Sequence, residues 1–207
     1  MSPISKMPQA VVFDMDDVLC EYRFDIRLGA LSRLSGKSPE FVEAAIWTSG
    51  FDEDGDRGRY SAQEYLAEFN RRLEAEISEA DWIEARAQSI IPDQAILQLV
   101  RAVSQKATVA LLTNNGPVFK RGMSAAFPEL VDLFAERAFC AYEFGGAKPE
   151  VTVFEGLAGR LAILPENILF IDDTADYIGG ARQAGLVAHH FTGALALKAE
   201  LERLQLL

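Results

Sequence analysis

Residues 11–19 read VVFDMDDVL, and this stretch decides the fold because acidic residues stand directly behind a buried strand. The apolar run AVVF (10–13) has the length of a β-strand. It lacks the alternation of a half-exposed strand, so we expect both of its faces to be covered. Because side chains alternate in extended backbone, Asp14 and Asp16 can turn toward the same edge. The pattern predicts an acidic site at the end of a buried strand.

Further apolar runs of strand length follow along the chain. They are TVALL (108–112), AFCA (138–141), ILFI (168–171) and LVAHHF (186–191). Apolar residues recur at helical spacing after Asp93 and again after Pro149, which stands where proline suits the first helical position. Strands that alternate with helices predict an α/β fold with a parallel sheet, whose ligands bind at the carboxyl ends of the strands.

Residues 25–90 interrupt this alternation, because they show short helical patterns and no convincing strand. Apolar stripes predict helices here: Ala62, Leu66, Phe69 and Leu73 form one, and Ile83, Ala87 and Ile90 form another. The segment FDEDGDRGR (51–59) is rich in Asp, Gly and Arg and predicts a loop. We expect a helical domain over 21–90, inserted into a core domain formed by 1–20 and 91–207. The alternative is that the helices simply pack on the sheet.

The bulk composition narrows the classes of partner and compartment. A chain of 207 residues can bury one good-sized core and a small satellite domain. Its net charge of -11 disfavours nucleic acid and anionic membranes as partners. The first ten residues lack the apolar region of a secretory signal, and no apolar run is long enough to span a membrane. We therefore expect a cytoplasmic protein in which Cys20 and Cys140 are reduced thiols.

The oligomeric state stays open between monomer and homodimer. Leu197, Leu201 and Leu204 share one face of the last predicted helix. This stripe suits packing on the core or a contact between two copies.

The two acids of the first cluster suit phosphorus chemistry. Carboxylates as close as those of Asp14 and Asp16 repel each other unless a cation neutralises them or one stays protonated. A magnesium ion needs only one or two protein carboxylates together with phosphate oxygens. With the ion holding Asp14 ionised, that carboxylate can attack phosphorus, and Asp16 can give a proton to the leaving oxygen and later take one from water. A solvated acidic loop is the alternative that this cluster alone does not exclude.

The segment LLTNN (111–115) places polar groups behind the second core strand. The hydroxyl of Thr113 and the backbone N–H groups of Asn114 and Asn115 suit the binding of phosphoryl oxygens. An ordinary turn is the alternative for this segment.

The segment GGAKPE (145–150) places Lys148 directly before a predicted helix. A lysine gains nothing from the helix dipole at that end, so its place there is better explained if it faces an anion. The segment FIDDTADYIGGA (170–181) ends a strand on Asp172 and Asp173. Asp173 suits a magnesium ligand, and Asp172 suits a group behind it that holds a coordinated water.

The ordered set DxDxVL, TN, KP and DD resembles the four motifs of the haloacid dehalogenase-like (HAD) superfamily, and it spans the sheet domain in the same order and spacing. The resemblance implies a Rossmann-like parallel sheet of strand order 5-4-1-2-3 with a C1-type helical cap after the first motif. It also implies the roles of individual residues: Asp14 as nucleophile, Asp16 as general acid and base, Thr113 and Lys148 as phosphate ligands, and Asp14, Asp173 and the backbone carbonyl of Asp16 as magnesium ligands.

Within the superfamily, TNN and FIDDTADYIGGARQAGL resemble the branch of bacterial sugar-phosphate phosphatases, notably the α-glucose-1-phosphate type, and the phosphatase domain of epoxide hydrolases. The chain departs from the pattern at two positions. Asp17 stands where many members have Gly, which adds charge and restricts the backbone. Tyr177 stands where Asp or Asn is common, which removes one outer hydrogen bond.

The sequence thus predicts a magnesium-dependent phosphomonoester hydrolase that acts on a small phosphorylated metabolite through an aspartyl-phosphate intermediate. The alternatives are a metal-independent 2-haloacid dehalogenase, a phosphomutase, and a module that binds phosphometabolites or serves in signalling. Asp16 together with Asp172 and Asp173 favours the phosphatase, because dehalogenation needs neither a metal ion nor a second acid.

Overall fold

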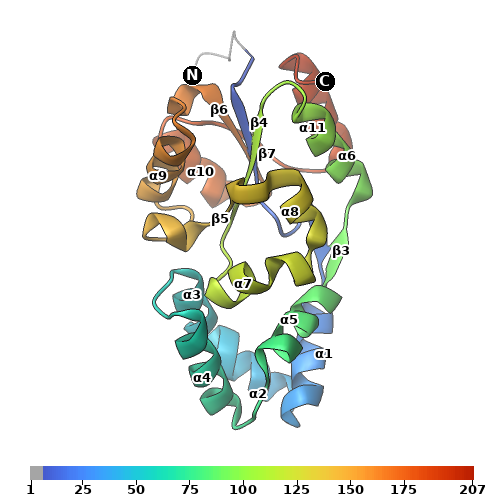
Figure 1. The fold of residues 1–207 in the computed structure, drawn as a ribbon, viewed down its shortest axis with the longest axis vertical. Coiled ribbons are helices and arrows are strands. Elements are labelled where there is room, and N and C mark those ends of the chain that lie inside the picture. The colour runs from blue at the N-terminus through green and yellow to red at the C-terminus, as the bar shows by residue number, and fades with distance from the viewer. Residues whose placement is uncertain (1–6) are drawn as a thin grey trace.

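A parallel sheet of five strands forms the centre of the molecule, in the order β5-β4-β1-β6-β7 (Figure 1). Its strands are β1 (Ala10–Phe13), β4 (Thr108–Thr113), β5 (Ala138–Cys140), β6 (Ile168–Asp172) and β7 (Val187–His190). When only these five strands are numbered along the chain, the order from β7 to β5 reads 5-4-1-2-3. The expected α/β class with a parallel sheet is confirmed.

The structure is a computed structural model that describes residues 7–207. Residues 1–6, which make up most of the start in which we expect no secretory signal, lie outside the described residues. No helix within residues 7–207 combines the length and the apolar character needed to cross a membrane.

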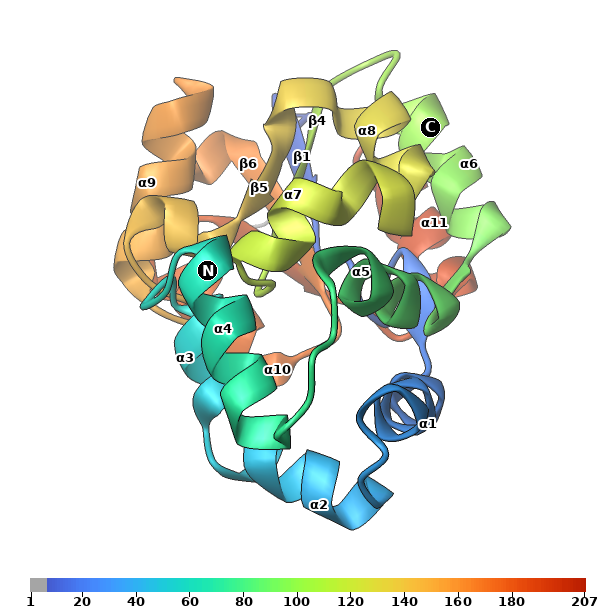
Figure 2. The same ribbon diagram turned by 60° about the horizontal axis from the view of Figure 1, so that its bottom comes forward.

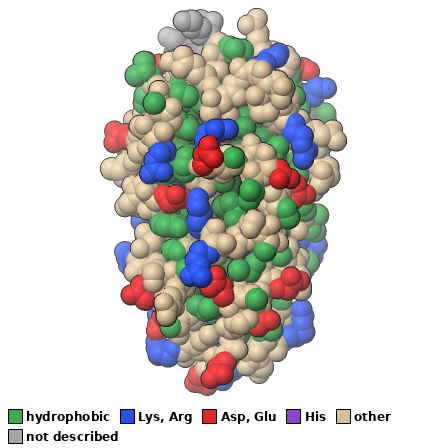
Figure 3. All heavy atoms as spheres, in the orientation of Figure 1, with side chains coloured by type: hydrophobic (Ala, Val, Ile, Leu, Met, Phe, Trp, Pro, Cys, Tyr) green, Lys and Arg blue, Asp and Glu red, His purple; other side chains and the backbone are tan. Residues whose placement is uncertain are grey.

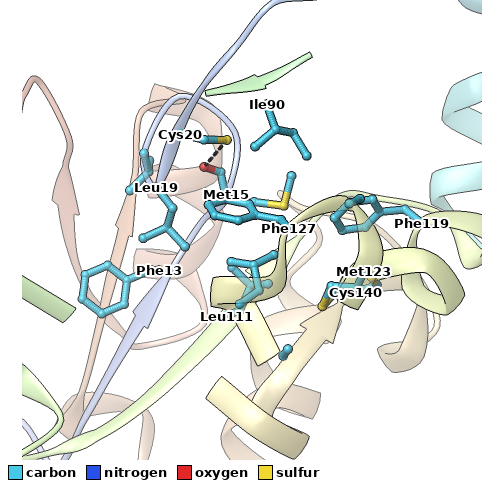
Figure 4. Close-up of a cluster of buried hydrophobic side chains, with 14 of the residues drawn as sticks. Phe13, Met15, Leu19, Cys20, Ile90, Leu111, Phe119, Met123, Phe127 and Cys140 are labelled. Atoms are coloured by element: carbon cyan, nitrogen blue, oxygen red, sulfur yellow. Dashed lines mark hydrogen bonds between the residues drawn. The ribbon is translucent and has the colours of Figure 1, made fainter. Parts of the chain in front are cut away.

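Helices cover both faces of the sheet, as the continuous apolar strands predict. Because side chains alternate along β1, Val11 and Phe13 belong to one apolar cluster while Ala10 and Val12 belong to another. The first face is covered by α6 (Gln94–Val103), α7 (Pro117–Ala126), α8 (Pro128–Phe134) and α11 (Ala194–Arg203), and the second by α9 (Val151–Leu161) and α10 (Ala175–Gln183). Figure 4 shows part of the first cluster, with side chains from the sheet (Phe13, Leu111), from α7 (Phe119) and from the residue between α7 and α8 (Phe127).

The segment between β2 (Cys20–Tyr22) and β3 (Ile90–Pro92) contains five α-helices, which gather at the end of the molecule away from both chain termini (Figure 1); Figure 2 shows this end turned toward the viewer. They are α1 (Phe24–Ser35), α2 (Pro39–Glu43), α3 (Phe51–Asp56), α4 (Ala62–Leu73) and α5 (Glu79–Gln88), with a π-helical turn over Ala44–Thr48. The segment begins and ends in a two-stranded antiparallel sheet of β2 (Cys20–Tyr22) and β3 (Ile90–Pro92), in which Tyr22 pairs with Ile90. Buried residues of these helices, among them Phe69 and Trp82, belong to the same apolar cluster as Phe13.

The loop expected over 51–59 is wrong over Phe51–Asp56, where the chain forms α3. The acids that suggested a loop, Asp52, Glu53 and Asp54, occupy the first turn, where the helix dipole favours negative charge. Phe51 is buried and anchors the helix. Gly55 belongs to the interior because the ring of Tyr65 lies where a Cβ would be.

The buried face of α5 is shifted by one position from the expected stripe. Trp82, Ala85 and Arg86 are the buried residues of this helix, whereas Ile83 and Ala87 are only half-buried. Arginine counts as polar in a hydrophobic pattern. The expected stripe therefore ran through the apolar residues next to Arg86 and not through Arg86 itself.

The helix expected to start at Pro149 starts later, at Val151. Ala147–Glu150 forms a turn, in which the N–H of Glu150 donates to the carbonyl of Ala147 and the Lys148–Pro149 peptide is cis. Lys148 therefore stands on a turn and not directly at a helix end.

The surface carries both signs of charge, and Figure 3 shows basic and acidic side chains interspersed on one face. Cys20 and Cys140 are both buried and free. In the last helix, Leu197 and Leu201 are buried within the chain itself, so this stripe packs on the core.

Candidate active site

The carboxyl ends of β1, β4 and β6 bring three polar side chains to one edge of the sheet. Phe13 is in register with Leu111 on one side and Ile171 on the other, and the N–H of Asp14 donates to the carbonyl of Ile171 at 2.9 Å. Asp14, Thr113 and Asp172 therefore end their strands beside one another, and all are buried. The sequence predicted this convergence.

Lys148 places its ammonium group between two of the acids. Its Nζ lies 2.7 Å from Oδ1 of Asp14 and 2.7 Å from Oδ2 of Asp172, and only 2% of the residue is exposed. Burial alone would lower the pKa of Lys148, but the two carboxylates outweigh it and raise that pKa. The lysine is therefore a fixed positive charge in a strongly negative chain.

Asn114 fixes the turn that carries Lys148. The N–H of Lys148 donates to Oδ1 of Asn114 at 2.9 Å, and Nδ2 of Asn114 donates to the carbonyl of Lys148 at 3.0 Å. The same Nδ2 lies 3.3 Å from the hydroxyl of Tyr177, whose ring centroid is 4.8 Å from Nζ of Lys148. Tyr177 thus supplies a hydrogen bond and a ring face at the position where the resemblance led us to expect a lost contact.

Asp14, Asp172 and Asp173 form a group in which each offers one carboxylate oxygen within 4.8 Å of the others. Burial raises the pKa of Asp14 to about 8, with Lys148 opposing the rise and Asp172 adding to it. Burial also raises the pKa of Asp173, and Asp172 adds to that rise. Oxygen ligands at this spacing fit a hard divalent cation such as Mg²⁺, which would relieve their repulsion.

The two oxygens of Asp172 already have partners within the chain. Oδ2 accepts from Lys148, and Oδ1 accepts from the N–H of Thr174 at 2.8 Å. Asp173 is more exposed than Asp172. The geometry therefore leaves Asp14 and Asp173 as the better-placed metal ligands of the three.

The side chain of Asp16 turns away from this group, so the structure does not bring its carboxylate to the other three acids. It accepts two hydrogen bonds from Nη2 of Arg86, at 2.6 and 2.7 Å, and one from Nδ2 of Asn115 at 3.2 Å. Asn115 also donates to Oγ1 of Thr113 at 2.8 Å. Sequence reasoning missed Arg86, since nothing in its helical pattern separates it from an exposed arginine.

Asp17 fits the backbone at the position where many HAD members have glycine. Its φ of 58° lies in the left-handed region, which Asp and Gly tolerate better than most residues. Its carboxylate accepts from the N–H of Tyr22 at 3.1 Å. Asp17 therefore stabilises the end of β2, and its side chain contributes to local structure.

A cavity of about 310 Å³ lies beside Lys148, between the helical segment and the core. Its wall from the core contains Asn114, Ala147, Lys148 and Tyr177, and its wall from the helical segment contains Trp47, Asp52, Glu53, Asp56 and Arg57. Arg57 and Trp47 thus line this cavity, whereas Arg59 is not among its lining residues and pairs with Asp54.

The acidic side chains of this wall have different partners and environments. Glu53 pairs with Arg57 at 3.2 Å, and Arg57 also pairs with Glu150. Asp52 accepts from the hydroxyl of Tyr65 at 2.5 Å. Burial raises the pKa of Asp56 well above its ordinary value, and the nearby charge of Asp52 adds to the rise. The wall opposite Lys148 is therefore rich in hydrogen-bond acceptors.

Comparison with known proteins supports the same reading of the fold. A model of haloacid dehalogenase-like hydrolases matches residues 8–185. A Mycobacterium tuberculosis protein named Phosphatase MT3486 is 30% identical over 192 residues, which cover 87% of this chain and 85% of that protein.

Two solved structures share the fold at 20% identity. A HAD family enzyme from Bacteroides thetaiotaomicron, in complex with magnesium and inorganic phosphate, has a TM-score of 0.75 over 88% of this chain and 93% of its own. A HAD-like family hydrolase from Porphyromonas gingivalis has a TM-score of 0.78 over 95% and 98% of the two chains. With its motifs at the carboxyl ends of the matching sheet, the chain belongs to the haloacid dehalogenase-like hydrolases.

Proposed function

We propose that this hydrolase is a magnesium-dependent phosphatase that removes phosphate from a small phosphorylated metabolite through an aspartyl-phosphate intermediate. The observation that carries the proposal is the buried ammonium of Lys148 between Asp14 and Asp172, with Asp173 completing the acidic group. Such a site joins a nucleophile, a fixed positive charge and a set of metal ligands within a few ångströms.

In the first half of the reaction, a carboxylate oxygen of Asp14 attacks phosphorus and forms a new P–O bond. The bond from phosphorus to the leaving alcohol breaks, and its electron pair stays on the alcohol oxygen, which takes a proton from Asp16. Lys148 and the hydroxyl of Thr113 bind phosphoryl oxygens, so that the developing negative charge is stabilised by groups already in place.

In the second half, the ionised Asp16 takes a proton from a water molecule whose oxygen attacks phosphorus. The bond between phosphorus and Asp14 breaks, its electron pair returns to the carboxylate, and inorganic phosphate leaves. Asp16 ends protonated and Asp14 ionised, so the starting state is restored.

Asp14, Asp173 and the backbone carbonyl of Asp16 would hold the magnesium ion, with Asp172 behind them. When bound, the ion neutralises the carboxylates and the phosphoryl oxygens that must approach each other. Support comes from the spacing of the three carboxylates and from the magnesium and phosphate found with the Bacteroides enzyme of the same fold.

We also propose that residues 21–90 act as a cap domain on a core formed by 1–20 and 91–207. The cavity supports this division, because one wall comes from each part. A site that lies between two parts of a chain can exclude water and select the substrate when they close. The buried free thiols of Cys20 and Cys140 suit a reducing compartment such as the cytoplasm.

A sugar phosphate fits the composition of the cavity. Asp52 and Asp56 offer acceptors to hydroxyl groups, and Trp47 offers a ring face to a sugar. A leaving group with its own carboxylate would lie against the carboxyl oxygens of Asp52 without gaining a hydrogen bond from them. We therefore expect neutral, hydroxyl-rich alcohols to be preferred over acidic ones.

A screen of phosphorylated metabolites tests the function directly. The purified protein should release inorganic phosphate from sugar phosphates in the presence of Mg²⁺, and full chelation should abolish the release. Parallel incubation with 2-haloacids measures halide release. Halide release that survives chelation, without phosphate release, would show a dehalogenase instead.

A further inference from the structure

Arg86, two residues before the end of α5, is buried although it carries a full charge. It exposes 1% of its surface, and its guanidinium lies 4.4 Å from the ring centroid of Tyr22 and 5.3 Å from that of Phe119. Nη1 donates to the hydroxyl of Ser89 at 3.3 Å, while Nε has no hydrogen-bond partner among residues 7–207. Such a group is costly to bury unless a charge opposes it.

The opposing charge is the carboxylate of Asp16. Both of its oxygens accept from Nη2 of Arg86, and within the described part of the chain no other carboxylate lies within 4.0 Å of this guanidinium. Asn115, at the end of β4, holds Asp16 from the core. The carboxylate is therefore fixed from two sides, by the helical segment and by the sheet.

We propose that Arg86 is a positioning residue, which holds the Asp16 carboxylate where it can serve the leaving oxygen. The inference rests on the proposed function, in which Asp16 gives its proton to that oxygen as the bond to phosphorus breaks. In this role Arg86 acts through Asp16 and not directly on the substrate. Because Arg86 belongs to α5, the helical segment positions the carboxylate of Asp16 and also forms one wall of the cavity.

A purely structural role for Arg86 would have a different kinetic consequence. Loss of packing would slow all substrates alike or only lower stability. Loss of a well-placed proton donor slows esters of poor leaving groups most, because a good leaving group departs without a proton. General acid catalysis contributes roughly 10²- to 10⁴-fold to rate.

The experiment measures kcat/KM with Mg²⁺ for a series of monoesters, from p-nitrophenyl phosphate to ethyl phosphate. This constant reports the steps up to loss of the alcohol, so later hydrolysis of the phosphoenzyme does not mask the effect. Arg86→Met and Arg86→Lys are compared with wild type and with Asp16→Asn. The matched control is Arg121→Met, because Arg121 on α7 forms another ion pair with α5, to Glu79 at 3.1 Å.

We expect kcat/KM of Arg86→Met to fall about 100-fold on ethyl phosphate and less than about threefold on p-nitrophenyl phosphate. The slope of log kcat/KM against the pKa of the leaving alcohol should be close to that of Asp16→Asn. Arg86→Lys, which keeps the charge but not the paired hydrogen bonds, should fall between wild type and Arg86→Met. Arg121→Met should keep the wild-type slope. Circular dichroism and thermal unfolding identify the variants that fold. If Arg86→Met does not fold, the comparison of Arg86→Lys with wild type tests the proposal.

A parallel loss on all esters, an unchanged profile or a gain in activity would overturn the role of Arg86 while leaving the phosphatase intact. A wild-type protein that hydrolyses no ester with Mg²⁺ would overturn the proposed function, and the role of Arg86 with it.

Discussion

The carboxylate of Asp14 is held in place by its neighbours, and replacing it should decide whether it is the nucleophile. Asp14→Asn keeps the size of the side chain and removes the nucleophile. We expect phosphatase activity to fall by about 10³-fold or more, because the remaining groups cannot form the covalent intermediate. Steady-state phosphate release measures the loss, and rapid acid quenching with a radiolabelled phosphate ester measures the intermediate.

Thermal unfolding should show that Asp14→Asn folds, since Asn can still accept a hydrogen bond from Lys148. An Asp14→Asn protein that turned over substrate at ordinary rate, or that became labelled at the same level as wild type, would refute the assignment of the nucleophile.

Single residues also show what the sequence could and could not reveal about the site. Asp14 and Asp172 were predictable because each directly follows an apolar strand, and strand ends meet at one edge. Arg86 and Asp56 were not, because each lies on a helix whose position over the site depends on how the helical segment folds. Their roles follow from contacts between residues far apart in the chain, which no local pattern contains.

The packing of α10 against the turn that carries Lys148 determines where that lysine lies. A Cβ on Gly180 would lie 2.1 Å from the carbonyl oxygen of Pro149, whereas a Cβ on Gly179 would meet nothing within 4 Å. Gly180→Ala must therefore push the turn and the helix apart. We expect it to lower stability by about 1–3 kcal/mol and kcat/KM at least about tenfold, through displacement of Lys148.

Gly179→Ala is the matched control in the same helix. It should raise stability by up to about 1 kcal/mol, since alanine favours the helix more than glycine does, and leave activity unchanged. Thermal unfolding and steady-state kinetics measure both variants. Equal effects of the two substitutions would show that the close approach of Gly180 to Pro149 does not position the lysine.

At the scale of elements, the sequence predicted all five core strands to within a few residues, because each is a continuous apolar run between polar ends. The helical segment was harder. The acids of α3 read as a loop, since their favourable interaction with the helix dipole is invisible in a hydrophobic pattern. The pairing of β2 with β3 was also missed, because each strand is only three residues long.

At the scale of the whole molecule, we expect Mg²⁺ to stabilise the folded protein by an amount that depends on pH. Burial raises the pKa values of Asp14, Asp56 and Asp173, so the folded state binds protons more tightly than the unfolded state. The contribution of these groups to the free energy of unfolding is fully present below their pKa values in the unfolded state. It is lost as the pH rises through their higher pKa values in the folded state. The metal-free protein should therefore lose stability from about pH 4 toward pH 8.

Mg²⁺ competes with protons for two of these acids, so it should stabilise more at pH 8 than at pH 5. At a hundredfold excess over its dissociation constant the gain is about 2.7 kcal/mol, which thermal unfolding with Mg²⁺ and with chelator measures. Asp173→Ala should remove the gain, whereas Asp176→Ala, at an exposed neighbour on α10, should keep it. A gain that persisted in Asp173→Ala would show that the ion binds elsewhere.

The paired strands β2 and β3 give the helical segment a single narrow stem, with its two ends side by side at Tyr22 and Ile90. A helical segment from a relative could therefore be grafted onto this stem without opening the central sheet. The graft would bring new cavity walls and so a new choice of substrate. It would also need an arginine in the place of Arg86, because otherwise Asp16 of the recipient would lose its partner.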